Sequence, residues 1–393
     1  MKAVICRNAA LSVVDRPEPV PGKGQVVLGV LRCGICGSDL HARHHCDYMD
    51  ELMTKSGFQS LMRSEDEVVF GHEFCGEVLE YGPGCARKVR TGSRVCALPI
   101  RRQPGGVDLI GLSKRSPGAY AERVVVEESM MLPVPNGLSA ELAALTEPMA
   151  VAWHAIRRGE VAKGDVAVVI GCGPVGLAVI CLLRTLGVKA IVASDFSPGR
   201  RALAQRCGAD VVVDPGRESP YAGARKYGFI AGLPDALELA VKTKEQLGRL
   251  PLPWWKMWRL AERLGLLPKK PVVFECVGAP GVLQSILEGA PLFSRVVVVG
   301  VCMQSDRIEP VLAINKELDL RFVLGYTPLE FHDTLRMIAE GRVDCAPLIT
   351  GVVGLAGVDN AFTALGDAER HAKIQVDPAS AAVQPAPAAE ARR

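Results

Sequence analysis

A glycine-rich segment constrains the fold of this 393-residue chain more than any other feature. Its sequence, VAVVIGCGPVGLAVICLLRTLG, runs from Val166 to Gly187 and sets three spaced glycines between two apolar runs. The uncharged part is about 18 residues long, which is also the length of a membrane span. However, three glycines and a proline at this spacing favour a buried strand, a glycine turn and a buried helix. The segment therefore predicts a βα unit of a parallel sheet.

Each glycine of this GxGxxG turn has its own role in a dinucleotide site. Gly171 allows the tight turn, Gly173 lets the backbone approach a pyrophosphate, and Gly176 permits close packing of helix on strand. The free N–H groups at the helix N-terminus favour phosphate binding. The next strand ends at Asp195, whose carboxylate can accept hydrogen bonds from ribose hydroxyls and repels a 2′-phosphate, which favours NAD over NADP. Arg200 leaves NADP use open, and a second interpretation is that Asp195 only caps a helix.

Further apolar runs extend this pattern into a sheet. They are short and nearly continuous, and the first of them alternate with helical segments, as is typical of a parallel sheet covered on both faces. The runs lie at 166–170, 190–194, 210–214, 272–275 and 295–300. The predicted cofactor site also includes Pro174, Val175, Val277, Val299 and Val301.

The rest of the chain has a different pattern. The first 150 residues contain short β-rich segments between turns. Residues 217–270 are too long for an ordinary crossover between parallel strands. The Ala- and Pro-rich tail 377–393 has little to bury, so we expect it to be disordered.

Composition argues against several classes of protein. The net charge is only +3 and charges of both signs are interspersed, which disfavours a nucleic-acid surface. The N-terminus lacks the apolar stretch and cleavage site of a secretory signal. The thirteen cysteines are scattered, so we expect reduced thiols in a cytoplasmic protein.

Three motifs in the N-terminal part offer metal ligands. CGICGSDLH contains Cys36, GHEF contains His72, and TEPMAVAWHA contains Glu147. A catalytic zinc takes about three thiolate, imidazole or carboxylate ligands and keeps one position open. Each residue alone also fits a structural role, as a small core residue, a buried histidine or a residue of a helix N-terminus. Together they predict one catalytic zinc ion, neutralised by a thiolate and a carboxylate.

The ordered motifs resemble those of a known family. GICGSDLH, GHE, PGAYAERVVV, EPMAVAWHA and the glycine turn are similar to the zinc-containing medium-chain dehydrogenase/reductase family, and most to its sorbitol and threonine dehydrogenase branch. The resemblance covers 1–215 and 271–376. It implies an α/β fold with a Rossmann doubly wound parallel sheet plus a β-rich GroES-like catalytic domain. The expected division is a catalytic domain at 1–150 completed by 327–376, an NAD-binding domain at 151–326 with insertion 217–270, and the tail.

The resemblance also implies roles for the residues around the metal. Cys36 and His72 match zinc ligands. Glu147 matches the third ligand position, directly or through water, and Glu73 matches a neighbouring glutamate that can enter or leave the metal shell. Which of the two glutamates binds in the resting state stays open.

Three more residues match the catalytic machinery of the family. Asp39 matches the carboxylate that orients the ligand histidine. Ser38 and His41 match the hydroxyl and imidazole through which the substrate proton reaches solvent. The implied activity is reversible hydride transfer between an alcohol and NAD, in a homodimer or homotetramer. A zinc-free quinone reductase and a non-catalytic NAD-binding sensor are the alternatives.

The sequence departs from its relatives in three places. Between Arg94 and Tyr120 it has only Cys96, so the structural zinc that many relatives hold with four cysteines is not expected. The loop between His41 and Phe70 is long and carries methionines and aromatics, which either line a pocket for a bulky apolar alcohol or simply pack the loop down.

The third departure is a basic amphipathic helix expected in the insertion. Trp254, Trp258, Ala261 and Leu264 recur at helical spacing with basic residues between them. Such a helix fits a subunit interface, a cap over the active site or a membrane surface, and tryptophan enrichment favours the first.

Overall fold

The computed structural model describes residues 1–265 and 270–387. Its chain divides into two compact units, and the first unit combines both ends of the sequence. That unit contains Met1–His154, Gly173–Thr185 and the C-terminal segment that starts at Leu324. The second unit contains Ala155–Cys172 and Leu186–Val323. The helix that follows the glycine turn therefore groups with the first unit, whereas the sequence assigned it to the cofactor domain.

The first unit is built on a mostly antiparallel sheet around β3 (Gln25–Gly34). The strand order is β10-β6-β5-β3-β18-β17, and β9 also pairs with β3. Only the pair of β17 and β18 is parallel. The other strands of this sheet are β5 (Glu73–Tyr81), β6 (Arg94–Ala97), β9 (Arg123–Glu127), β10 (Met131–Pro133), β17 (Ile349–Val353) and β18 (Lys373–Val376). The C-terminal strand β18 pairs with β3, so the last part of the chain adds a strand to the sheet formed by the N-terminal part.

Two small sheets and several helices complete the first unit. One sheet has the order β2-β1-β4 and the other is the hairpin of β7 and β8. These strands are β1 (Lys2–Arg7), β2 (Ala10–Asp15), β4 (Val68–Val69), β7 (Ile100–Gln103) and β8 (Gly106–Leu109). The helices are α1 (Gly37–Lys55), α2 (Ala140–Ala143), α3 (Thr146–Arg158), which reaches into the second unit, α4 (Pro174–Leu186), α10 (Pro328–Ala339) and α11 (Val358–Leu365). Phe70, Phe74 and Tyr120 are fully or almost fully buried in the core.

Helix α1 corrects the expectation of a long loop after His41. The segment up to Lys55 is helical because Asp39 accepts a hydrogen bond from the backbone N–H of Cys36 and so caps the first turn. The helix is kinked at His45. After it, Met62 packs into the core with 1% exposure, whereas Tyr48 is 38% exposed. The burial of Met62 therefore supports the interpretation that the apolar residues of this segment pack it against the core, and not the one in which they line a substrate pocket.

The second unit contains a six-stranded, entirely parallel sheet. Its order is β13-β12-β11-β14-β15-β16, the doubly wound arrangement in which the strand order reverses between β11 and β14. Its strands are β11 (Val166–Ile170), β12 (Ala190–Ser194), β13 (Val211–Val213), β14 (Val272–Glu275), β15 (Arg295–Val298) and β16 (Asp319–Phe322). Its helices are α5 (Pro198–Arg206), α6 (Leu233–Gly248), α7 (Trp254–Arg263), α8 (Val282–Gly289) and α9 (Pro310–Asn315). The predicted Rossmann sheet is confirmed.

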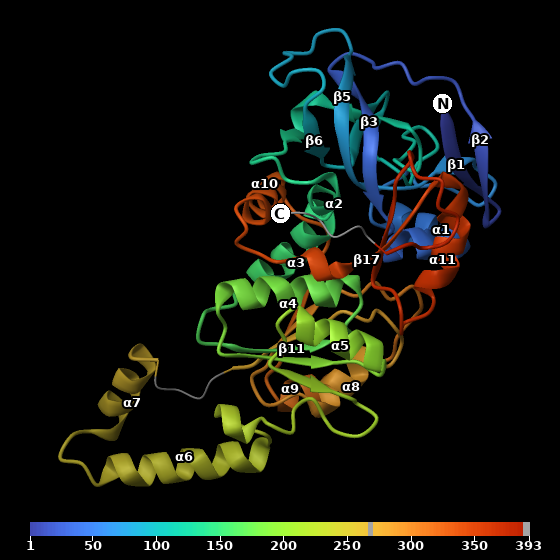
Figure 1. The fold of residues 1–393 in the computed structure, drawn as a ribbon. Helices are drawn as coiled ribbons and strands as arrows, with labels where there is room; N and C mark the ends of the chain where they lie inside the picture. The colour runs from blue at the N-terminus through green and yellow to red at the C-terminus, as the bar shows by residue number, and fades with distance from the viewer. Residues whose placement is uncertain (266–269, 388–393) are drawn as a thin grey trace. The chain divides into compact units, whose positions relative to one another are not determined.

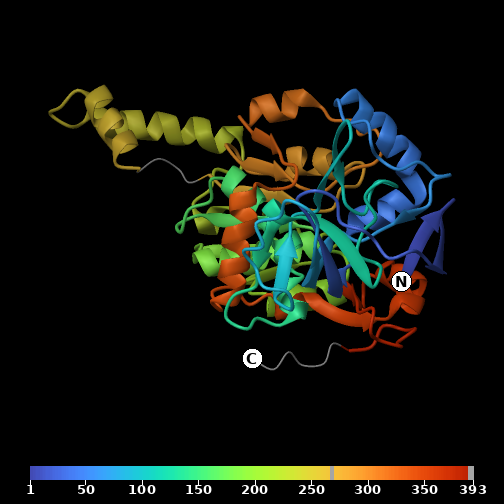
Figure 2. The same cartoon turned by 90° about the horizontal axis from the view of Figure 1, so that it is seen from above.

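In the described part of the insertion, the α-helices α6 and α7 are neighbours (Figures 1 and 2). Lys244 of α6 lies 5.7 Å from the ring of Trp254 in α7, and Trp254 meets Trp258 edge to face at 6.4 Å. Of the residues that the structure describes in these two helices, none is buried. The amphipathic helix is confirmed; Trp254, Trp255 and Leu260 are exposed in the single chain, whereas Trp258 and Ala261 are half-buried.

The tail prediction is wrong for residues 377–387. The N–H of Gly354 donates to Ala382, and Val352 and Ala386 exchange two backbone hydrogen bonds. Asn360 also donates to the carbonyl of Val383. These bonds give the Ala- and Pro-rich segment backbone partners that its composition does not indicate. The expectation for 388–393 lies outside the described residues.

The described part of the chain contains no helix that is both long and apolar enough to span a membrane. The uncharged run that begins at Val166 is divided between β11 and α4, so neither piece alone has the length of a span.

Candidate metal and cofactor sites

Three of the predicted metal ligands meet at the start of α1 and the start of β5. Cys36 is the N-cap residue of α1, His72 immediately precedes β5, and Glu73 is its first residue. One ligand atom from each lies within 4.8 Å of the other two. Glu73 is fully buried, His72 is 8% exposed, and Cys36 is half-buried. A thiol, an imidazole and a carboxylate in a largely buried site form a donor set that fits zinc.

Asp39 faces the imidazole of His72 across a short ion-pair distance. Its Oδ1 lies 3.3 Å from Nδ1 of His72, and its Oδ2 accepts hydrogen bonds from the hydroxyl of Tyr120 at 2.7 Å and the N–H of Cys36 at 3.0 Å. Burial alone would raise the pKa of Asp39. The charge of His72 beside the carboxylate, and the hydrogen bonds from Tyr120 and from the N–H of Cys36, outweigh burial and lower this pKa. Nε2, on the other side of the ring, is then the nitrogen that faces the metal donors, and it also contacts Ser38.

Ser38 lies beside the metal donors. Its Oγ is 3.3 Å from Nε2 of His72. His41 is three residues further along α1, on the same side of the helix, and is half-buried. Burial, followed by the charge of His45, lowers the pKa of His41. The predicted relay residues therefore lie on one helix that starts at the metal site.

Glu147 lies near these donors but is not part of the group that meets within 4.8 Å. It belongs to the first turn of α3 and is buried. Its pKa is raised to about 7, chiefly by burial and also by the charge of Glu73, against the opposing charge of His72 and a hydrogen bond with Tyr326. The geometry thus brings Cys36, His72 and Glu73 together and leaves the role of Glu147 a prediction.

The sequence did not reveal the partner of Glu73. Nζ of Lys373 lies 2.7 Å from both carboxylate oxygens of Glu73 and donates to the carbonyl of Ile35 at 2.9 Å. Lys373 is 1% exposed. A signal was present, because a lysine in a fully buried strand needs a partner. Tyr120 and Tyr326, which contact Asp39 and Glu147, were also missed as site residues.

The glycine turn after β11 has the geometry that a nucleotide site requires. Gly171 has φ +90°, and a Cβ there would lie 2.6 Å from Val277. A Cβ on Gly173 would meet nothing within 4 Å, which leaves space for a close ligand. Gly176 is buried in α4, which Pro174 begins, as proline favours the first helical position. Val175 follows and is half-buried.

The carboxyl ends of β14 and β15 approach each other closely. A Cβ on Gly300 would lie 2.3 Å from the backbone nitrogen of Gly278. Val277 and Val301 are 46% and 56% exposed beside these glycines, whereas Val299 is buried. Two of these three predicted contact residues are therefore accessible at the edge where doubly wound sheets bind ligands.

Asp195 is anchored next to the glycine turn. Its Oδ2 accepts a hydrogen bond from the N–H of Cys172 at 2.8 Å, and its Oδ1 accepts one from the N–H of Ser197 at 2.8 Å. Ser197, not Asp195, is the N-cap of α5. Arg200 lies 4.0 Å from Oδ2. These contacts argue against the interpretation of Asp195 as only a helix cap.

Comparison with known proteins decides the family. The model of the alcohol dehydrogenase GroES-like domain matches residues 22–136. The (R,R)-butanediol dehydrogenase of Bacillus subtilis (strain 168) is 30% identical over 383 residues, which cover 95% of this chain and 97% of that protein. The chain belongs to the zinc-containing medium-chain dehydrogenase/reductase family. It is an oxidoreductase of the alcohol dehydrogenase type.

Another relative and a solved structure support the same family assignment for this dehydrogenase. The sorbitol dehydrogenase of Gallus gallus is 25% identical over 362 residues, which cover 89% of this chain and 88% of that protein. A crystal structure of 2R,3R-butanediol dehydrogenase from Bacillus subtilis superimposes with a TM-score of 0.72 at 29% identity, covering 96% of this chain and 99% of that one. The predicted family and fold are confirmed.

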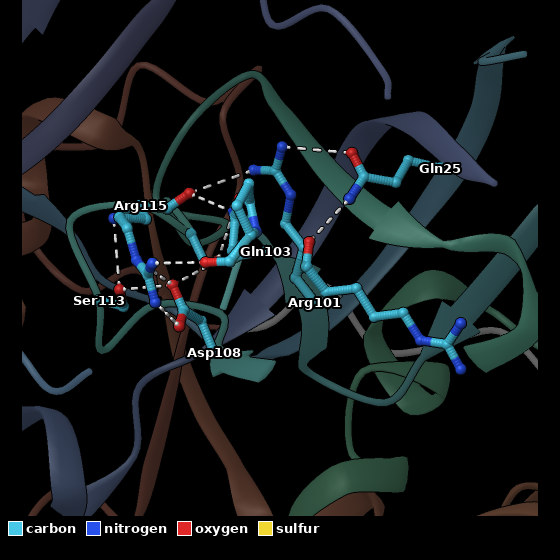
Figure 3. Close-up of polar contacts among 9 residues, drawn as sticks. Gln25, Arg101, Gln103, Asp108, Ser113 and Arg115 are labelled. Carbon is cyan, nitrogen blue, oxygen red and sulfur yellow. Dashed lines mark hydrogen bonds and ion pairs between the residues drawn. The ribbon is translucent and has the colours of Figure 1, made fainter. Parts of the chain in front are cut away.

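A polar network holds the segment of this dehydrogenase between β6 and β9, which contains the β7–β8 hairpin (Figure 3). Nη2 of Arg115 lies 2.6 Å from Oδ1 of the fully buried Asp108. Ser113 donates to the other oxygen at 3.0 Å. Arg101 donates to Gln25 of β3, and Gln103 donates to the carbonyl of Arg115. These bonds tie the β7–β8 hairpin to the following turn and to the central sheet.

Proposed function

We propose that this dehydrogenase uses NAD and one zinc ion to convert a secondary alcohol to a ketone reversibly. The observation that supports the proposal best is the meeting of Cys36, His72 and Glu73 within 4.8 Å in a chain of this family. A bound zinc ion would supply Lewis acidity toward the alcohol oxygen, and a bound nicotinamide cofactor would supply the hydride acceptor. The relatives named for butanediol and sorbitol support a secondary alcohol as substrate.

The residues of the chain supply the proton path. Ser38 lies next to the metal donors through its 3.3 Å contact with His72, so its hydroxyl can accept the substrate proton. His41 is the next group on that side of α1, and its lowered pKa keeps the imidazole neutral and able to accept a proton near neutral pH. Asp39 holds the ring of His72 in position. We infer that Cys36, His72 and one of the two glutamates hold the metal.

The choice of NAD rests on Asp195. Its carboxylate is anchored beside the glycine turn by two backbone N–H groups, and its charge disfavours a 2′-phosphate. Arg200, 4.0 Å away, is the residue that would accommodate NADP if the carboxylate were removed.

We also infer a homo-oligomer. Strand β16 lies at the edge of the parallel sheet, and Phe322 on it and Ile314 on α9 are 65% and 71% exposed. An exposed edge strand with apolar side chains favours pairing with a second copy. Light scattering with Phe322→Glu as the variant tests this, because a mass that stays unchanged from the wild type would contradict pairing through this edge.

One experiment tests the enzymatic proposal. The purified protein is analysed for metal and then assayed by NADH formation on a panel of secondary alcohols that differ in bulk and polarity, with NAD and NADP in parallel. Wild type should contain about one zinc per chain and prefer NAD, whereas Cys36→Ala should lose both zinc and turnover. A zinc-free wild type would favour a quinone reductase, and turnover that survives Cys36→Ala would contradict the zinc mechanism. Binding of NAD without turnover on any alcohol would favour a sensor.

A further inference from the structure

The buried ion pair between Lys373 and Glu73 competes directly with the metal site. Both carboxylate oxygens of Glu73 lie 2.7 Å from Nζ of Lys373, and the two side chains are 0% and 1% exposed. One oxygen of Glu73 also belongs to the group of donor atoms that meets within 4.8 Å. The same carboxylate is therefore within reach of a lysine and of a metal.

The strand arrangement places Glu73 and Lys373 on either side of β3. Glu73 begins β5 and pairs with Gly34 at the end of β3, while β18 with Lys373 pairs with the other side of β3. A Cβ on Gly34 would lie 2.0 Å from Oε2 of Glu73. Because glycine has no side chain, the Glu73 carboxylate can lie directly over the backbone of β3. The conformation of Glu73 that faces the lysine therefore requires glycine at position 34.

A shift of Glu73 toward the metal would leave Lys373 poorly compensated. Apart from Glu73, Nζ donates to the carbonyl of Ile35 at 2.9 Å, and the charges of Cys36 and Glu147, which also act on Lys373, would be shared with a bound metal. A buried ammonium without a counter-ion is strongly unfavourable. The lysine therefore favours the state in which Glu73 stays away from the metal.

We propose that Lys373 is a positioning residue that limits the access of Glu73 to the metal, although one Glu73 oxygen lies within 4.8 Å of the donor atoms of Cys36 and His72. Glu147 would then supply the third ligand in the resting state, at the position that the sequence predicts. This inference rests on the proposed function, because it requires that zinc binds at this site. In this proposal Glu147 binds the metal in the resting state, whereas Glu73 is paired with Lys373. Charge supports it, since one thiolate and one free carboxylate already balance a divalent ion, while Glu73 is balanced by Lys373.

The test removes the lysine charge and reads out metal binding rather than turnover. In Lys373→Met, Glu73 loses its counter-ion and should move to the metal, whereas Lys373→Arg keeps the charge and serves as the matched control. Zinc affinity is measured by competition with a chelator, and the metal shell is observed through the visible spectrum of the Co²⁺-substituted protein. We expect Lys373→Met to change the Co²⁺ spectrum and to bind zinc more tightly, because the released carboxylate becomes an additional ligand. Substitutions beside metal ligands change affinity by about 10- to 100-fold, and we expect an effect of that size in this direction. Lys373→Arg should resemble the wild type.

A second substitution identifies the moving group. The spectral change of Lys373→Met should disappear when Glu73→Gln is added, because a neutral amide is a poor zinc ligand. Persistence of the change in this double variant would overturn the proposal, as would a Lys373→Met protein with wild-type affinity and spectrum. Gly34→Ala provides an independent route if Lys373→Met does not fold, because the new Cβ must displace Glu73 from the lysine. It should then produce the same spectral change, and an unchanged spectrum would again overturn the proposal.

The outcome for Lys373 can be separated from the outcome for the proposed function. Wild-type protein that takes up no zinc or Co²⁺ contradicts the proposed function itself. Wild-type protein that binds the metal through Cys36, but whose shell does not respond to Lys373→Met or Gly34→Ala, contradicts only the positioning role.

Discussion

The carboxylate of Asp39 lies 3.3 Å from Nδ1 of His72, and both side chains are buried. A carboxylate at Nδ1 fixes the ring orientation and makes Nε2 the better metal ligand. Asp39 also caps α1 through the N–H of Cys36. One side chain therefore positions two of the predicted metal ligands.

The first prediction concerns this contact. Asp39→Asn should weaken zinc binding about 10- to 100-fold, because the amide orients His72 less well and carries no charge. Chelator competition measures the loss, and circular dichroism checks that the fold is retained. Tyr120→Phe, which removes the 2.7 Å hydrogen bond to Asp39 but keeps its charge, should produce a smaller loss. Equal zinc affinity in Asp39→Asn and wild type would contradict the orienting role.

The second prediction concerns cofactor choice. Asp195→Ser removes the charge that disfavours a 2′-phosphate and leaves Arg200 without its partner at 4.0 Å. Because a hydrogen bond to a charged group contributes about 1.5–3 kcal/mol, kcat/KM for NAD should fall at least about tenfold. The value for NADP should rise. The ratio of the two constants, measured in the same preparation, is the readout, and an unchanged ratio would show that Asp195 does not contact the ribose.

The third prediction concerns the polar network around Asp108. Burial alone would raise the pKa of Asp108, but hydrogen bonds from Arg115, Ser60 and Ser113 and the charge of Arg115 lower it. Because the pKa of Asp108 is lower in the folded protein, its ionised carboxylate stabilises the fold at pH values above the ordinary pKa of 3.8. This stabilisation is lost as the pH falls through the pKa that Asp108 has in the folded state. Asp108→Asn should therefore cost about 2 kcal/mol near pH 7, and the difference should vanish in acid.

Urea denaturation at a series of pH values checks this expectation. Asp333→Asn on the surface of α10 is the control, and its free energy of unfolding should match the wild type at neutral pH. A difference for Asp108→Asn that stays constant down to pH 2 would show that the ionised carboxylate is not the source of the stability.

The fourth prediction concerns the α6–α7 insertion. Leu237, Trp255 and Leu260 are 60%, 49% and 48% exposed, so replacing them with Gln should change the stability of the single chain by no more than about 0.5 kcal/mol. Leu335→Gln, at a position with 2% exposure in α10, should destabilise it strongly. A stability loss in the insertion variants that grows with protein concentration would show that a second copy covers these side chains. That result would support the subunit-interface interpretation.

Part of this molecule could be read from local sequence. The strand β11, the glycine turn and α4 were predictable because the periodicity and the glycine spacing are properties of neighbouring residues. Cys36, His72 and Asp195 were found because each lies in a short motif of specific chemistry. By contrast, α1 was expected as a loop, since its capping contact between Asp39 and Cys36 is invisible in apolar periodicity.

The tertiary structure decided the pairings that join distant parts of the chain. Lys373 meets Glu73 across 300 positions because β18 and β5 flank the same strand, and no local pattern encodes which strands become neighbours. The hydrogen bonds that order residues 377–387 depend in the same way on β17 being in place. Residue types determined which chemistry this protein could perform, whereas the pairing of strands decided which carboxylate is held by a lysine, because long-range contacts arise only when the whole sheet forms.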